Sequence, residues 1–126
     1  MVSQATANKR KGSRWESEVQ NGFRRWDFEY EQIRLQGALD EGDGWIRHAK
    51  NDITLVEAKS GAMQPAHMDE VLAEKVNFAK RRGIPEGDVY PIVIYKRRGK
   101  KFEDALVVTT VRDFFGLVEA EEGSNG

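Results

Sequence analysis

Apolar residues recur along this chain at helical spacing in one stretch and at strand spacing in others. The first helical stripe has separations of four, four and three residues, which places its members on one face of a helix. Its members are Trp15, Val19, Phe23 and Trp26. Ser13 followed by Glu16 forms a capping-box pattern, so we expect this helix to begin at Ser13.

Two further helices are predicted by the same kind of pattern. Apolar residues at helical spacing run through 66–82, and Gly83 followed by Pro85 is typical of a helix end. Thr110 and Asp113 form another capping-box pattern, which predicts a short helix through 114–117.

Residues 53–59 show the clearest alternation of a β-strand. Successive side chains of a strand point to opposite faces, so one face carries four residues and the other three. The first face holds Ile53, Leu55, Glu57 and Lys59, and the second holds Thr54, Val56 and Ala58. We expect the apolar start of the first face to lie in the core and its charged end to emerge at the rim.

Four other segments are predicted strands, which gives an α/β chain of order α-β-β-β-α-β-β-α. They are 29–35, 43–48, 89–95 and 105–109. Pro91 indicates that the early part of its strand lies at a sheet edge or is irregular. We expect a mixed central sheet flanked by helices in one domain over 13–118, with a flexible basic arm over 1–12 and a disordered acidic tail over 119–126.

Composition and charge indicate where the protein is found and which kind of partner it binds. The 126 residues contain no cysteine and no apolar run of the roughly 20 residues that a membrane span needs, so we expect a cytoplasmic protein. The formal net charge is -1, yet the basic residues are clustered, and clusters set the field that phosphates feel. Solvated loops and helix ends are the alternative explanation for such clusters. The clusters comprise Lys9, Arg10, Lys11 and Arg14; Lys80, Arg81 and Arg82; and Lys96, Arg97, Arg98, Lys100 and Lys101.

The candidate chemistry lies in three residues. Asp43 is in a glycine-flanked turn, and Glu57 and Lys59 share one face at the end of a strand. Carboxylate oxygens suit hard cations such as Mg²⁺ or Mn²⁺, and an ammonium group can stabilise charge developing on a phosphate. The pattern therefore favours metal-assisted hydrolysis of a phosphodiester.

Each of these residues also has a purely structural interpretation. Asp43 suits a turn, and Glu57 with Lys59 can form a simple same-face ion pair. Glu16 can cap its helix, contribute to the metal site, or do both. Asp52 competes with Asp43, but its position in a hairpin turn places it about 16 Å from Glu57 along the strand, too far for one metal.

Other cofactor signals are missing or weak. Gly42 to Gly44 lacks the Gly-Lys-Ser/Thr of a phosphate-binding loop, so we expect no nucleotide cofactor. His48 and His67 have no ligand-like spacing, and we interpret both as ordinary residues.

These residues resemble the motifs of the PD-(D/E)xK nuclease superfamily, and more closely those of its archaeal and phage Holliday junction resolvases. Segment 11–16 (KGSRWE) is similar to the first-helix motif, 42–43 (GD) to the second motif, and 56–59 (VEAK) to the (D/E)xK motif. Segment 94–99 (IYKRRG) looks like the basic end of the fourth strand in phage members. The resemblance extends over about residues 9–118.

The resemblance implies a restriction-endonuclease-like core and a Mg²⁺-dependent endodeoxyribonuclease, located in the host cytoplasm if it is encoded by a phage. It implies Glu16, Asp43 and Glu57 as metal-site acids and Lys59 as the catalytic lysine. The implied substrate is branched DNA, most of all a four-way junction, cut by a homodimer. Alternatives are a nuclease acting on nicked, flapped or linear duplex DNA, and a non-catalytic DNA-binding module. The residues expected to contact DNA are Lys9, Arg10, Lys11, Ser13, Arg14, Lys96, Arg97, Arg98, Lys100 and Lys101.

Overall fold

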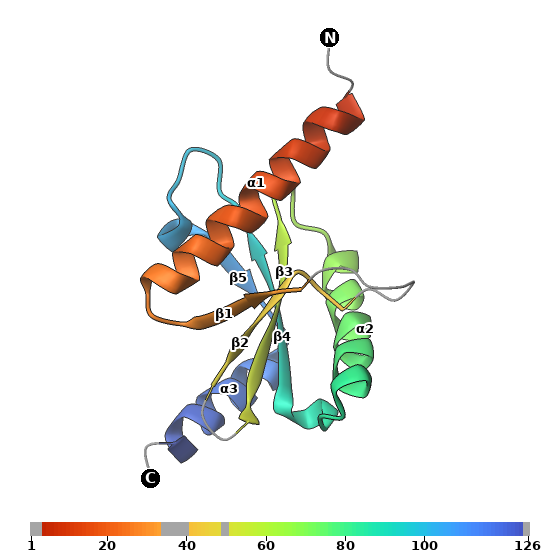
Figure 1. Ribbon diagram of the computed structural model, residues 1–126, viewed down its shortest axis with the longest axis vertical. Helices are drawn as coiled ribbons and strands as arrows, with labels where there is room; N and C mark the ends of the chain where they lie inside the picture. Colours follow the sequence, from red (N-terminus) through yellow and green to blue (C-terminus); the bar gives the residue numbers. More distant parts are fainter. Residues whose placement is uncertain (1–3, 34–40, 49–50, 125–126) are drawn as a thin grey trace.

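The computed structural model describes the backbone of residues 4–33, 41–48 and 51–124, and the side chains of 12–33, 41–48 and 51–119 (Figure 1). The elements are, in order, α1 (Gln4–Arg25), β1 (Glu29–Gln32), β2 (Gly44–Arg47), β3 (Ile53–Lys59), α2 (Pro65–Arg82), η2 (Glu86–Asp88), β4 (Val89–Tyr95), η3 (Phe102–Asp104), β5 (Leu106–Val108) and α3 (Val111–Ser124). The chain is therefore α/β, as predicted. None of the described helices is long and apolar enough to cross a membrane.

The sheet has five strands in the order β1-β2-β3-β4-β5. The strands β1, β2 and β3 pair antiparallel, β3 pairs parallel with β4, and β5 returns antiparallel to β4. Helix α2 provides the crossover that a parallel pair requires. The mixed central sheet flanked by helices is therefore confirmed.

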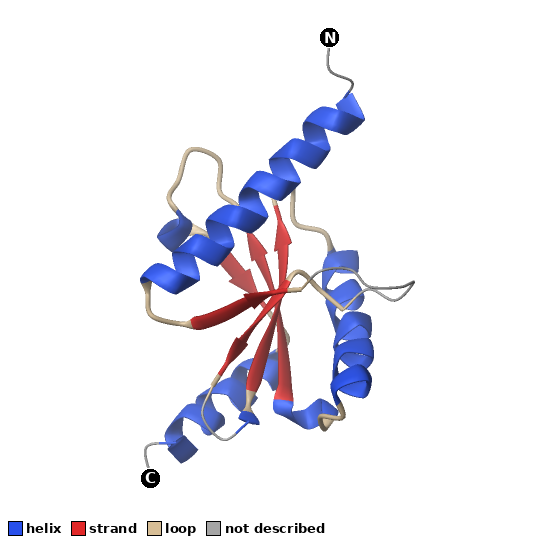
Figure 2. Cartoon of the chain, in the orientation of Figure 1, coloured by secondary structure: helices blue, strands red, loops and turns tan. Residues whose placement is uncertain are grey.

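Helices lie on both faces of the sheet (Figure 2). An apolar cluster on each face holds them to it. Trp15 and Val19 of α1 pack against Val56 and the residues beside it. Phe78 of α2 packs on the other face, with Leu55 in the same cluster. The alternation predicted for β3 is thus confirmed, because Leu55 and Val56 point into different layers.

Helix α1 begins earlier than the sequence pattern predicts. It starts at Gln4 and not at Ser13, so Ser13 lies inside the helix and does not cap it. The carbonyl oxygen of Ser13 accepts a hydrogen bond from the Ser17 hydroxyl one turn later. Ser13 and Glu16 look like a capping box, but residues 4–12 have enough helix-forming side chains to continue the helix through them.

The other helix ends agree with the sequence. Helix α2 ends at Gly83, which adopts a left-handed conformation (φ 65°) and donates its N–H to the last turn. Helix α3 begins with the predicted capping box, in which the Asp113 N–H donates to the Thr110 hydroxyl at 3.1 Å. It continues to Ser124, into the segment that the sequence assigns to a tail.

The prediction that the early part of the strand containing Pro91 lies at a sheet edge is confirmed. Strand β5 pairs only with the last part of β4, from Val93 to Tyr95, so the early part of β4 has no strand on that side. The Pro91 carbonyl accepts a hydrogen bond of 2.6 Å from the Thr109 hydroxyl instead. The missing N–H of proline therefore interrupts no described strand pairing.

Tyr30 of β1 lies directly against the backbone of Gly44 in β2, which gives a test of this packing. A methyl group at Gly44 would collide with the Tyr30 ring, and that ring is stacked on Phe23 with centroids 5.6 Å apart. We expect Gly44→Ala to lower the free energy of unfolding by about 1–3 kcal/mol, measured by urea denaturation.

Gly61 is the matched control, because a Cβ there meets no atom within 4 Å. We expect Gly61→Ala to change stability by less than about 1 kcal/mol. Equal stabilities for the two variants would contradict the close contact between Tyr30 and Gly44.

Candidate active site

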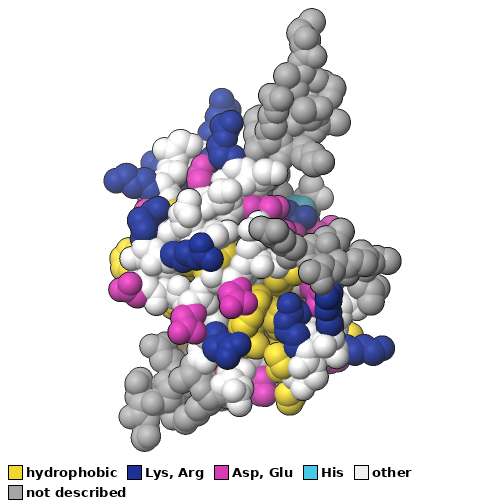
Figure 3. Space-filling view, viewed as in Figure 1, with side chains coloured by type: hydrophobic (Ala, Val, Ile, Leu, Met, Phe, Trp, Pro, Cys, Tyr) yellow, Lys and Arg dark blue, Asp and Glu magenta, His cyan; other side chains and the backbone are white. Residues whose placement is uncertain are grey.

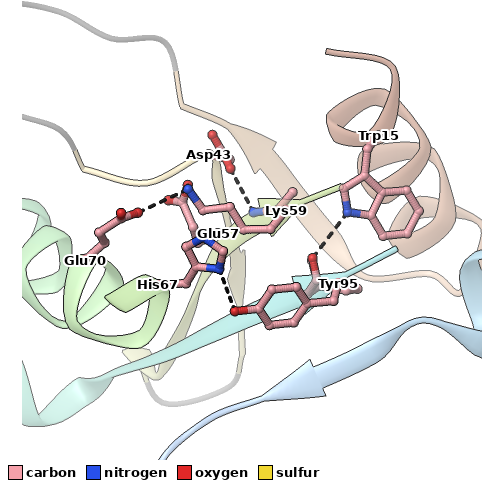
Figure 4. Close-up of polar contacts among 9 residues, drawn as sticks. Trp15, Asp43, Glu57, Lys59, His67, Glu70 and Tyr95 are labelled. Carbon is pink, nitrogen blue, oxygen red and sulfur yellow. Dashed lines mark hydrogen bonds and ion pairs between the residues drawn. The ribbon is translucent and has the colours of Figure 1, made fainter. Parts of the chain in front are cut away.

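Asp43 and Glu57 come together at the carboxyl end of β3 (Figure 4). The Asp43 N–H donates to the Val56 carbonyl at 3.0 Å, which extends the pairing of β2 with β3 by one residue. The Asp43 carboxylate in turn accepts a hydrogen bond of 2.8 Å from the Ala58 N–H. These two bonds hold the Asp43 side chain beside Glu57.

Glu57 is buried, with a relative exposure of 7%, and does not emerge at the rim as its place in the strand pattern suggests. Burial raises the pKa of the Asp43 carboxyl to about 8, and the charge of Glu57 and a side-chain hydrogen bond to it act in the same direction. The Ala58 N–H opposes this shift. The Asp43 carboxyl is therefore protonated over much of the neutral range.

Glu16 approaches this pair from α1, on the other face of the sheet. Its charge further raises the pKa of Asp43, which places the two groups in the same electrostatic environment. Burial raises the pKa of the neighbouring Tyr30, and the charges of Asp43, Glu16 and Glu57 add to that effect. Within the described part of the chain, however, no three acidic or histidine side chains are arranged to hold a metal ion.

Lys59 lies on the same face as Glu57 and between two acids. Its ammonium nitrogen is 3.7 Å from the Glu57 carboxylate and 3.1 Å from that of Glu70 on α2. Partial burial lowers the pKa of Lys59, but the hydrogen bond to Glu70 and the charges of Glu57, Glu70 and Asp43 outweigh it and raise the pKa above its ordinary value. Lys59 is therefore a cation throughout the neutral range.

The first turns of α2 add side chains that the sequence pattern does not single out. His67 lies one turn before Glu70, and its Nδ1 is 2.8 Å from the Tyr95 hydroxyl. Tyr95 is the partner of Lys59 in the parallel register, so His67 connects α2 to the strand end that carries the site. His67 and Glu70 are three residues apart, directly after the loop that follows Lys59. This spacing indicates that both side chains lie on the same face of the helix, and it is the feature of the sequence that could have identified them.

Asp52 lies at the opposite end of β3 from the acid pair. Its carbonyl accepts a hydrogen bond of 2.8 Å from the His48 N–H, next to the amino end of the strand. The imidazole of His48 is hydrogen bonded to the Thr54 hydroxyl at 2.7 Å. Of the two candidate acids, Asp43 is thus the one beside Glu57, and His48 has a structural contact.

Basic side chains gather beside α1, over the loop that joins β4 to β5 (Figure 3). Lys96 is half-buried and anchored: its ammonium lies 3.3 Å from Glu18 and over the Trp15 ring. Six predicted DNA contacts are exposed. They are Ser13, Arg14, Arg97, Arg98, Lys100 and Lys101. The side chains of Lys9, Arg10 and Lys11 lie outside the described residues.

The basic cluster at the end of α2 has a different role. Arg81 and Arg82 both bind the carboxylate of Glu41, at 2.8 and 2.7 Å. Glu41 is buried, and the Arg82 guanidinium also covers the Phe78 ring at 4.0 Å. Two of the three charges in this cluster are therefore committed to an internal ion pair.

Comparison of the chain with protein-family models, with curated proteins and with solved structures gives no match.

The acid pair predicts a pH-dependent stability difference between the wild type and Asp43→Asn in the absence of metal. The folded-state pKa of Asp43 lies near 8 and the unfolded-state pKa near about 3.9, so the wild type loses stability as the pH rises from 4 to 8. Asparagine does not ionise, and its amide oxygen can still accept the Ala58 N–H. We expect the variant to melt at a higher temperature than the wild type at pH 8, with the difference shrinking toward pH 5.

Asp52→Asn is the matched control, because Asp52 lies at the far end of the same strand from the acid pair. Thermal melts in EDTA at several pH values give the comparison. Parallel pH profiles for the wild type and Asp43→Asn would show that Asp43 ionises as it does in the unfolded chain.

Proposed function

We propose that this chain is a metal-dependent endonuclease of the PD-(D/E)xK superfamily that cleaves branched DNA, above all four-way junctions. The observation that carries the proposal is the convergence of Asp43 and Glu57 at the end of β3, with the Lys59 ammonium 3.7 Å from Glu57. The α/β order and the parallel β3–β4 pair support a restriction-endonuclease-like core.

The acid pair fits a divalent cation such as Mg²⁺, or Mn²⁺ in its place. The buried Glu57 carboxyl and the partly buried Asp43 carboxyl offer oxygen ligands, and a cation can neutralise the negative charge that raises the pKa of Asp43. Mg²⁺ is commonly held by one or two carboxylates together with substrate phosphates, so Asp43 and Glu57 suffice as protein ligands, with Glu16 close enough to add charge. A bound cation would polarise the phosphate and favour ionisation of an attacking water.

Lys59 acts as a hydrogen-bond donor and a fixed positive charge in this proposal. Its raised pKa keeps it protonated, so it stabilises negative charge on the phosphate oxygens and does not remove a proton from water. Glu70 is 3.1 Å from Lys59 and its side chain is half exposed. We infer that Glu70 orients the lysine and yields to the phosphate when DNA is bound.

Arg14 of α1 and the exposed basic residues of the β4–β5 loop suit contact with DNA phosphates. The loop begins next to the site, because the Lys96 N–H donates to the Lys59 carbonyl at 3.1 Å. Phosphate contacts position the protein without reading base sequence, which fits a substrate defined by its branched shape. Cutting both strands of a four-way junction symmetrically requires two sites, and therefore a homodimer.

The test is cleavage of a labelled four-way junction in Mg²⁺, with linear duplex of the same sequence alongside. We expect paired cuts on the junction, no cuts in EDTA, and a rate at least about 100-fold lower for Glu57→Gln, which keeps the shape of the side chain but loses its charge. Asp52→Asn is the matched control and should cut like the wild type. Equal cutting of the duplex would leave a nuclease without junction preference, and binding without cutting would indicate a non-catalytic module.

A second comparison separates the roles of Lys59 and Glu70. We expect Lys59→Gln to bind the junction with little loss of affinity but to cut it at least about 100-fold more slowly, because it removes the charge near the phosphate. Glu70→Gln should reduce the rate by less than about 10-fold, since it removes only an orienting contact. Fluorescence anisotropy measures the affinity for the junction, and single-turnover cleavage measures the cutting rate. A larger reduction in cutting rate for Glu70→Gln than for Lys59→Gln would reverse the assignment.

A further inference from the structure

The two edges of the sheet differ in chemistry. At one edge, β1 carries the exposed acids Glu29 and Glu31, and the Arg24 guanidinium binds the Tyr30 carbonyl at 3.1 Å. Charged side chains on an edge strand oppose pairing with another chain. At the other edge, β5 consists of Leu106, Val107 and Val108 only. Segment 105–111 contains no charged residue, so no charged side chain of this segment opposes pairing.

Apolar side chains on this second edge are exposed to solvent. Leu106 is 42% exposed and Val107 is 58% exposed, and they point to opposite faces of the sheet because they are adjacent in the strand. An uncovered apolar edge strand is a site at which further strands add.

Helix α3 follows β5 directly and continues the apolar surface. Val111, Phe114, Phe115 and Val118 have the spacing i, i+3, i+4 and i+7, which places them on one stripe, and all four are exposed. The opposite side of the helix faces the sheet, where Gly116 lies against Tyr90 and Asp113 is buried. The exposed stripe is therefore an additional apolar face and not the one that holds α3 to the domain.

The surface formed by β5 and this stripe has the size and charge pattern of a self-association interface. A standard interface takes about 800 Å² from each partner. The two phenylalanines and four aliphatic side chains of this surface are 40% to 71% exposed, so they supply part of that area. The exposed Asp104 precedes the uncharged segment and the exposed Arg112 follows it. A two-fold axis that sets β5 antiparallel to a second β5 brings the acidic end of each segment toward the basic end of the other.

We propose that the β5–α3 surface binds a second copy of this chain, with the two β5 edges antiparallel and the stripes of both α3 helices buried in the contact. The inference stands on this surface and does not depend on the proposed cleavage. A basic partner such as a DNA-binding face does not suit the surface, because Arg112 is its one basic residue among those described.

Sedimentation equilibrium without DNA or metal tests the interface separately from any nuclease activity. We expect a wild-type mass of twice 14.3 kDa, and at least about 100-fold weaker association for Val107→Lys and for Phe115→Glu. Both positions are exposed, so circular dichroism should show an unchanged fold. Glu31→Lys, at the opposite edge, is the matched control and should remain dimeric. A wild type that is monomeric at about 100 µM, or a dimer that survives both variants, would overturn the proposal.

Single cysteines locate the contact, because the chain contains none of its own. Val107→Cys should form a disulfide-linked dimer under mild oxidation, since residues near the centre of an antiparallel two-fold pair approach within bonding distance. Glu31→Cys should remain unlinked. Cross-linking of Glu31→Cys in preference to Val107→Cys would place the interface at the β1 edge and contradict the assignment.

Discussion

Strands β3 and β4 run parallel along their full lengths, and a parallel pair cannot be joined by a tight turn. The connection must cross over one face of the sheet, which is where α2 lies, and α1 then covers the other face (Figure 1). The carboxyl ends of both strands lie at the same end of the sheet, so Lys59 and Tyr95 are neighbours in register. The start of α2 lies beside them, because His67 is hydrogen bonded to Tyr95. The position of the candidate site is thus a consequence of strand direction.

The acid pair is costly for the folded state. Burial of Asp43, together with the charge of Glu57 beside it, raises the pKa of Asp43 and opposes its ionisation. This cost is offset by the apolar packing of Leu55 and Val56 along the same strand. The Ala58 N–H lessens the cost because it donates to the Asp43 carboxylate. A site of this kind is held in place by the packing around it, so damage to the core should disturb its geometry as well as the stability of the fold.

Much of the fold follows from local sequence patterns, and the site follows only in part. The bounds of β3 and β4 and the end of α2 at Gly83 agree with the sequence, because alternation and a left-handed glycine are local signals. The start of α1 does not, because Ser13 resembles a cap but the helix continues past it. The burial of Glu57 and the contact between His67 and Tyr95 depend on the crossover of α2, which no local pattern reports.

Pro91 also governs how far the hairpin of β4 and β5 can extend. A strand that slid along β4 toward its amino end would meet a residue with no N–H to donate, and the Pro91 carbonyl is already bound by Thr109. The register of β5 is therefore fixed. Side-chain packing alone would not fix the register of this strand, because it has only three residues and all of them are aliphatic. A fixed register also determines where β5 begins, and therefore the length of the basic loop that joins β4 to β5. Pro91 thus influences the length of a loop at the opposite end of the sheet.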